Sequence, residues 1–279
     1  MKNDVPHSLL LVAGRHTYPL LFIQAARAAG VKRIEVVAFK GETNRAILPL
    51  ADKIHWLHLG SMRAFLDTLA STGISHCALV GQIAPRNLFQ VRMDRLALEM
   101  YKALKVRNAH TIFGAIANAI EALGMQVIPA NSFMEHHTPQ EGLLSQRAPT
   151  KQERADIQMG LRLVKGTSDF EMGQTVAIKE GMIIAVEAFE GTNQTIRRAG
   201  RVGGAGSVIV KVPKIGHDMR FDIPVVGTKT FQIMKKAKAS CLAVEAGKTI
   251  LLEREKLIER ANRLGMAFLA VRQEDLDLP

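Results

Sequence analysis

The chain has 279 residues, of which 47% are hydrophobic, 23% are charged and only 5% are aromatic. This composition is typical of a globular protein, excludes a disordered or fibrous one, and favours two domains because single cores stop growing near about 250 to 300 residues. The net charge of +11 would suit nucleic acid, anionic lipid or a polyanionic small molecule, but two Tyr and one Trp are few for stacking on bases, so we expect no nucleic-acid partner.

The first half of the chain alternates between short apolar runs and helical patterns. It begins with a strand at 8–14, a helix at 19–30 and a second strand at 33–39. The alternation continues with strands at 53–60, 76–82 and 125–130 and helices at 61–72, 93–105 and 110–123. Such units wind into an open parallel sheet that binds ligands at the carboxyl ends of its strands. We therefore expect a Rossmann-like N-terminal domain over residues 1–132.

A polar, proline-containing stretch at 133–149 predicts a linker. Thr150 and Glu153 then form a capping box, which begins a helix. We expect a distinct C-terminal α/β domain over residues 150–279, and we expect this domain to carry the chemistry.

The second half combines strand and helix patterns. Two segments, 174–191 and 241–253, are each predicted to form a β-hairpin. A short helix should begin at Thr192. Residues 207–227 contain two apolar strands around a polar stretch, and the remaining predicted elements are helices at 229–239 and up to 264 and a strand at 266–272.

Around that polar stretch, a single run of about a dozen positions, 211–222, contains six ionisable residues: Lys211, Lys214, His217, Asp218, Arg220 and Asp222. If the chain is extended there, Arg220 and Asp222 share one face, with Phe221 on the other. Lysine and arginine bind pyrophosphate, and aspartate binds magnesium. An ordinary salt bridge on a surface strand would explain Arg220 and Asp222 by themselves. All six ionisable residues together favour a functional site.

Two weaker patterns complete the candidates. Glu187 and Glu190 precede the helix at Thr192, where carboxylates can bind a hard cation but more often stabilise the helix dipole. The loop at 14–19 follows the first strand and opens the first helix, which is the position of a phosphate cradle in nucleotide-binding folds. It has neither a dinucleotide-binding nor a Walker pattern.

Cys77 and Cys241 both lie in apolar strand-like runs, so we expect two buried thiols and a reducing compartment, the cytoplasm. No segment approaches the roughly 20 apolar residues that span a bilayer. Contact with the inner-leaflet membrane surface, as a peripheral protein, is an expected second location.

Long stretches of the chain resemble the UDP-2,3-diacylglucosamine pyrophosphohydrolases that are unrelated to calcineurin-like phosphoesterases. The stretches are GQTVAIKEGMIIAVEAFEGTNQTIRRAG (173–200), VIVKVPKIGHDMRFDIPVVGTKTFQIMKKAKASCLAVEAGKTILLE (208–253) and ALVGQIAPRNLF (78–89). The chain departs from that family's usual glycine-rich loop at Arg15 and His16, and from its usual K-P-x-Q-D motif at Ile215 and His217.

The resemblance implies a Mg²⁺-dependent hydrolase, or one that uses another divalent cation, which cleaves UDP-2,3-diacylglucosamine into 2,3-diacylglucosamine 1-phosphate and UMP in lipid A biosynthesis. It implies a homodimer that holds the lipid-linked nucleotide between its two domains. The resemblance implies that Asp222, in its R-x-D-x-P motif, is the essential aspartate. We further expect Lys211, Lys214 and Arg220 to act with Asp222 in catalysis. We expect the substrate to be bound by Gly14, Gly81, Gln82, Thr192, Arg197 and Arg198, and a metal by Asp222, Asp218, Glu187 and Glu190.

Two alternatives remain open at this point. The changed loop after the first strand would suit a hydrolase of another nucleotide-diphosphate sugar. A non-catalytic lipid- or nucleotide-binding relative is the second, although such a protein has little use for metal-binding carboxylates.

Overall fold

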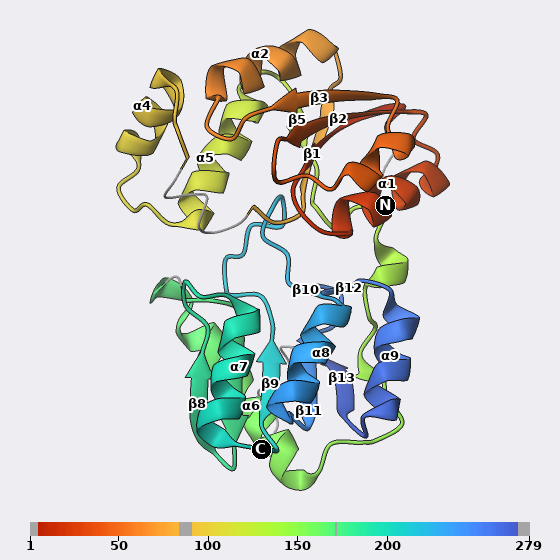
Figure 1. The fold of residues 1–279 in the computed structure, drawn as a ribbon, viewed down its shortest axis with the longest axis vertical. Coiled ribbons are helices and arrows are strands. Elements are labelled where there is room, and N and C mark those ends of the chain that lie inside the picture. The colour runs from red at the N-terminus through yellow and green to blue at the C-terminus, as the bar shows by residue number, and fades with distance from the viewer. Residues whose placement is uncertain (1–4, 84–90, 171, 273–279) are drawn as a thin grey trace. The chain divides into compact units, whose positions relative to one another are not determined.

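The computed structural model describes residues 5–83, 91–170 and 172–272, and the chain divides into two compact units (Figure 1). The N-terminal unit comprises residues 1–134 together with 218–222. The C-terminal unit comprises residues 135–217 and 223–279. This division differs from the predicted one, because the five residues that include Asp222 belong to the N-terminal unit.

The N-terminal unit contains a parallel five-stranded sheet in the order β3-β2-β1-β4-β5. Its strands are β1 (Ser8–Ala13), β2 (Arg33–Phe39), β3 (Lys53–Leu57), β4 (His76–Val80) and β5 (Gln126–Val127). Its helices are α1 (Tyr18–Ala29), the 3-10 helix η1 (Arg45–Leu50), α2 (Met62–Thr72), α4 (Arg95–Ala103) and α5 (Ala109–Glu121). The predicted Rossmann-like arrangement is confirmed, and the strand order reverses between β1 and β4.

Both faces of this sheet are covered. Successive residues Leu9, Leu10 and Leu11 of β1 are all fully buried, although neighbouring side chains of a strand point to opposite faces. Leu10 belongs to the cluster that packs against α2 and α5. The apolar run of β1 is unbroken because helices cover both faces of the strand.

The C-terminal unit contains a mixed six-stranded sheet in the order β6-β13-β11-β9-β7-β8. Its strands are β6 (Gly142–Leu143), β7 (Thr175–Lys179), β8 (Met182–Val186), β9 (Val208–Lys211), β11 (Cys241–Glu245) and β13 (Ala267–Val271). The strands β9, β11 and β13 are parallel, and β7 and β8 form the predicted hairpin. A separate pair joins β10 (Val225–Val226) to β12 (Ile250–Leu251).

Helices cover both faces of the mixed sheet. α6 (Lys151–Gly166) packs on one face through Ile157, Leu161 and Val164. The other face is covered by α7 (Thr192–Gly203), α8 (Thr228–Ala237) and α9 (Arg254–Arg263). Two 3-10 turns, η2 (Glu135–His137) and η3 (Ser168–Phe170), complete the described elements of this unit.

Local signals in the second half are confirmed in part. The capping box of α6 is present, since the Thr150 hydroxyl accepts from the Glu153 amide at 3.1 Å and the Thr150 amide donates to the Glu153 carboxylate at 2.8 Å. Both cysteines are buried, and burial raises the pKa of each thiol to about 12. The helix that begins at Thr192 is longer than predicted and reaches Gly203.

Three predicted local structures are wrong. Residues 241–253 do not form a hairpin, because β11 pairs with β9 and β13 in parallel and β12 pairs with β10. The 133–149 segment is not a free linker, because β6 pairs antiparallel with β13. Residues 219–221 form a turn and not a strand. In each case, partners far away in the sequence override the local pattern.

A search of the described residues finds no helix that is both apolar enough and long enough to cross a membrane.

Candidate functional site

The ends of β1 and β4 bring together Gly14, Gly81 and Gln82, three of the predicted substrate-binding residues. The Gly14 amide donates to the Val80 carbonyl and the Arg15 amide to the Gln82 carbonyl, each at 2.8 Å. A Cβ atom at Gly14 would lie 2.6 Å from the Gly81 carbonyl carbon and 2.7 Å from the Gln82 oxygen. Only glycine fits there, so the two loops form a close contact made of main chain.

This contact lies where the strand order of the parallel sheet reverses, which is where open α/β sheets bind ligands. α1 starts directly afterwards, with a proline in its first turn and an N-cap residue, Thr17, that gives no side-chain cap. The amides of the first turn of a helix attract anions. In the N-terminal unit, a glycine contact and a helix start therefore lie at the position where such sheets bind ligands. Arg15, in the same loop, pairs with the buried Glu42 at 3.3 Å.

The C-terminal unit contains a second cluster at the start of α7 and the end of β9. The Lys211 ammonium donates to the Thr192 hydroxyl at 2.7 Å. That hydroxyl donates to the Glu187 carboxylate at 3.1 Å, and it lies 3.1 Å from the Thr175 hydroxyl. Lys211 and Glu187 are only 8% and 9% exposed. One hydroxyl therefore links two buried, oppositely charged side chains.

Gly173 is required beside this cluster and was not among the predicted residues. Its amide donates to the Glu187 carbonyl at 2.8 Å, and a Cβ atom there would collide with the Glu187 side chain. A glycine just before a strand carries no periodic signal, so sequence reasoning missed it. Any larger side chain at this position would therefore displace Glu187.

A buried ion pair holds the chain that follows Lys211. The Lys165 ammonium donates to the Glu245 carboxylate at 2.6 Å and to the Pro213 carbonyl at 2.7 Å. Burial lowers the pKa of Lys165, although Glu245 opposes the shift. The pair joins residues 80 positions apart, which the sequence did not indicate. Lys214, a predicted catalytic residue, comes directly after this fixed point and is half-buried.

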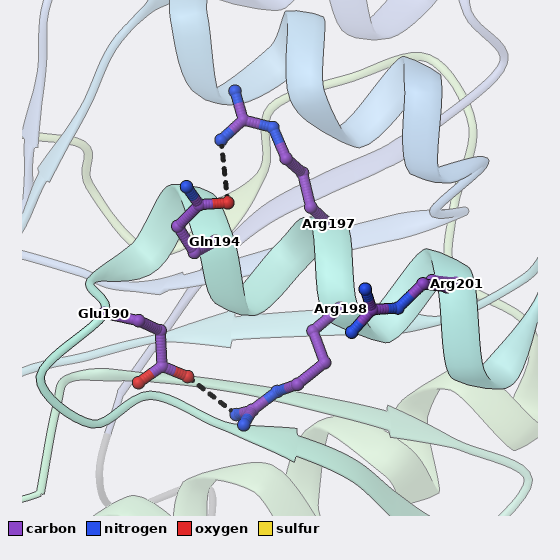
Figure 2. Close-up of a pocket in the computed structure, with 5 residues that line it drawn as sticks. All are labelled: Glu190, Gln194, Arg197, Arg198 and Arg201. Atoms are coloured by element: carbon purple, nitrogen blue, oxygen red, sulfur yellow. Dashed lines mark hydrogen bonds and ion pairs between the residues drawn. The ribbon is translucent and has the colours of Figure 1, made fainter.

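The arginines of α7 line a surface hollow of about 690 Å³ (Figure 2). Arg198 pairs with Glu190 at 2.8 Å and donates to the Val186 carbonyl at 2.6 Å, while Arg197 donates to Gln194 at 3.1 Å. Arg201 also lines the hollow and was not predicted. Arg197 and Arg198 are thus brought together on an exposed, cationic face of the helix.

The segment 218–222 packs inside the N-terminal unit. Asp218 accepts from the Arg220 amide at 3.0 Å and from its guanidinium at 2.7 Å. The Asp222 amide donates to the Asp218 carbonyl at 3.0 Å, and the Met219 carbonyl accepts from Ala130 at 2.8 Å. The predicted strand alternation of Arg220 and Asp222 is therefore wrong, because hydrogen bonds that Asp218 accepts close a turn.

The contact between Asp218 and Arg220 also shifts the pKa values of both side chains. Hydrogen bonds from Arg220 hold the pKa of Asp218 below its usual range, against the opposing effect of burial. The same interaction raises the pKa of Arg220. Asp222 itself is half-buried.

The four predicted metal ligands are divided between the two units. Asp218 and Asp222 belong to the N-terminal unit, whereas Glu187 and Glu190 belong to the C-terminal unit. Asp218 is bound by Arg220, Glu187 by Thr192 and Glu190 by Arg198. Across the described residues, no group of three His, Cys, Asp or Glu side chains is arranged to hold a metal. Within either unit taken by itself, these carboxylates therefore form no preformed magnesium site.

Comparison with known proteins gives a consistent result over both units. The family model for the LpxI N-terminal domain matches residues 8–137, and that for the LpxI C-terminal domain matches residues 140–269. The chain is 24% identical over 274 residues to the UDP-2,3-diacylglucosamine pyrophosphatase LpxI of Caulobacter vibrioides, covering 94% of this chain and 96% of that protein.

A solved structure also shows a distant likeness. It is the biotin carboxylase domain dimer of the 2-oxoglutarate carboxylase from Hydrogenobacter thermophilus, with 11% identity over 74% of this chain and 44% of that chain. The TM-score is 0.30, which is too low to support a conclusion about fold or function.

Proposed function

Because the chain belongs to the LpxI family, we propose that it hydrolyses the pyrophosphate of UDP-2,3-diacylglucosamine to 2,3-diacylglucosamine 1-phosphate and UMP in lipid A biosynthesis. The observation that carries the proposal is the match of both family domains, in order, over residues 8–137 and 140–269. A relative named for this activity aligns over 94% of the chain, so neither unit is missing.

The N-terminal unit supports a role in binding the nucleotide part of this substrate. The main chain at Gly14 is in close contact with Gly81 and Gln82, where any larger side chain would collide, and this contact fixes the loop at the strand ends. The start of α1 offers amides to an anion. We assign the nucleotide to this position.

The C-terminal unit supports a role in binding the anionic part. Lys211 is positioned by Thr192 and Glu187, and the exposed arginines of α7 surround a hollow that suits an anion. In such a reaction a fixed cation stabilises the charge that develops on the phosphoryl oxygens. We assign that role to Lys211, with Lys214 and Arg197 as further cations.

Asp222 is the proposed catalytic carboxylate. It lies at the end of a turn that hydrogen bonds keep closed, and it is half-buried. A carboxylate in that setting can orient a water molecule for attack on phosphorus and accept its proton. The water's oxygen then forms the new P–O bond, and the bond from that phosphorus to the bridging oxygen breaks.

Magnesium dependence is a separate proposal. Among the described residues, the two predicted carboxylates of each unit form no preformed metal site by themselves, so we derive no step through a metal. We expect activity to be lost in EDTA and restored by Mg²⁺. Full activity in EDTA would contradict this expectation without affecting the assignment of the substrate.

The substrate's lipid part also leads us to propose contact with the inner leaflet of the membrane and, from the resemblance, a homodimer. Co-sedimentation with anionic liposomes tests the first. Light scattering of the purified protein tests the second, since a monomer would give half the expected mass.

The decisive experiment measures UMP release from UDP-2,3-diacylglucosamine by the wild type and by Asp222→Asn, which removes the charge but preserves the shape. We expect a loss of about 100-fold or more. Asp67→Asn is the matched control, because Asp67 is an exposed residue of α2 in the same unit. Absence of UMP release by the wild type would reject the proposed function, whereas an active Asp222→Asn would reject only the assignment of Asp222.

A further inference from the structure

Arg220 has no donor left for a substrate. Its Nε atom donates to Asp218 at 3.0 Å, and its Nη1 atom donates to Glu121 at 2.7 Å and Asn118 at 3.2 Å. Its Nη2 atom donates to Asp218 at 2.7 Å and to Asn118 at 3.2 Å. A guanidinium carries five N–H groups, and these contacts use all five.

The next residue provides an apolar anchor to the same helix. The Phe221 ring lies against α5, with centroid distances of 5.7 Å to His110 and 6.1 Å to Phe113. Phe221 also packs on the cluster formed by α2, α5 and the sheet. Two adjacent side chains, one charged and one aromatic, thus attach a segment from the second half of the chain to α5 in the first half.

We propose that Arg220 and Phe221 are positioning residues that hold the Asp222 turn on α5, and that Asp218 serves this attachment and is not a metal ligand. This inference rests on the proposed function and refines it. The main chain agrees, since the Met219 carbonyl is bound by Ala130 and the Asp222 amide by Asp218. We call the contacts of Arg220 with Asp218, Asn118 and Glu121 the α5 clasp.

The clasp predicts that Glu121, 99 positions before Arg220, affects catalysis only through Arg220. Displacement of a catalytic group by about 1 Å can cost up to about 100-fold in rate. We therefore expect Glu121→Gln to lower kcat about 10-fold and Arg220→Met about 100-fold, with KM changed less than about two-fold. The double variant should be no slower than Arg220→Met alone.

A phosphate-binding Arg220 would behave differently. Arg220→Met would then raise KM and Glu121→Gln would retain the wild-type kcat, whereas a double variant slower than Arg220→Met alone would mean that Glu121 acts independently of Arg220. Any of these results overturns the proposal. Glu99→Gln is the matched control, since it removes the same group from an exposed ion pair with Arg95 in the same unit.

Amide hydrogen exchange tests the clasp independently of activity. The Phe221 and Asp222 amides both donate to the Asp218 carbonyl, so a peptide covering 218–222 should be protected in the wild type. We expect at least about 10-fold faster exchange there in Glu121→Gln and Arg220→Met, and no change in Glu99→Gln. Unchanged protection would overturn the clasp even if the wild type releases UMP. If the two variants lose protection but the wild type releases no UMP, the clasp stands and only the proposed function is rejected.

Discussion

The two units build their candidate binding positions from different parts of the chain. At the ends of β1 and β4, main-chain atoms of Gly14, Gly81 and Gln82 are in close contact, and side chains contribute little. At the start of α7, the side chains of Lys211, Thr192 and Glu187 form the position. Protein stability should therefore be sensitive to added side-chain volume at the ends of β1 and β4, and to the loss of polar groups at the start of α7.

The largest effect is expected for added volume in the N-terminal unit. Gly14→Val places side-chain atoms against the Gly81 and Gln82 main chain and should destabilise the protein by about 3 kcal/mol, because packed main chain cannot move aside. Urea unfolding monitored by circular dichroism measures this. Gly166→Ala is the control, because nothing lies within 4 Å of a Cβ atom there. Equal stability of Gly14→Val and the wild type would show that the strand ends are not in close contact.

An intermediate effect is expected from charge in the C-terminal unit. Burial alone would raise the pKa of Glu153, but hydrogen bonds from Arg147, Ser240 and Thr150 outweigh it and lower the pKa from 4.5 to about 2. A lowered folded-state pKa stabilises the protein above the unfolded-state pKa, and this stabilisation is lost as the pH falls through the folded-state value. Glu153→Gln should therefore cost about 2 kcal/mol at pH 7.

The difference between wild type and Glu153→Gln should shrink between pH 4.5 and about pH 2 and vanish below it. Thermal unfolding at a series of pH values follows this change. Glu259→Gln is the control, since Glu259 forms an exposed ion pair with Arg263 at 3.6 Å. A pH-independent difference would mean that shape, and not charge, accounts for the effect of Glu153.

The smallest effect on stability is expected at the hydroxyl between Lys211 and Glu187. Thr192→Val preserves the shape of the side chain but removes the acceptor for Lys211 and the donor to Glu187, at a cost of about 1.5 kcal/mol. We also expect slower UMP release, because the Lys211 ammonium is no longer held. Thr192→Ser should restore both properties. If the valine variant matches the wild type in rate, Lys211 does not need this contact.

Much of the fold was predictable from local patterns. Alternating apolar runs and helical periodicity correctly indicated the parallel sheet of the N-terminal unit, and a capping box located the start of α6. The buried cysteines were also predicted correctly. Each of these signals is contained within a few neighbouring residues, because helix caps and side-chain periodicity depend on local geometry.

Other features depended on partners that the sequence does not identify. The run at 241–253 reads as a hairpin, yet β11 lies between two parallel strands and β12 pairs elsewhere. For the candidate site, the residue types were recognisable, but the link from Lys211 through Thr192 to Glu187 was not.

The sequence by itself determined the α/β class, the order of most elements and the residues able to carry chemistry. Only the tertiary structure decided that Asp218 to Asp222 belong to the N-terminal unit, where Arg220 is fully engaged with α5. The physical reason is that a residue's polar partners depend on which distant segments the sheets and helices bring beside it, and no local pattern encodes that choice.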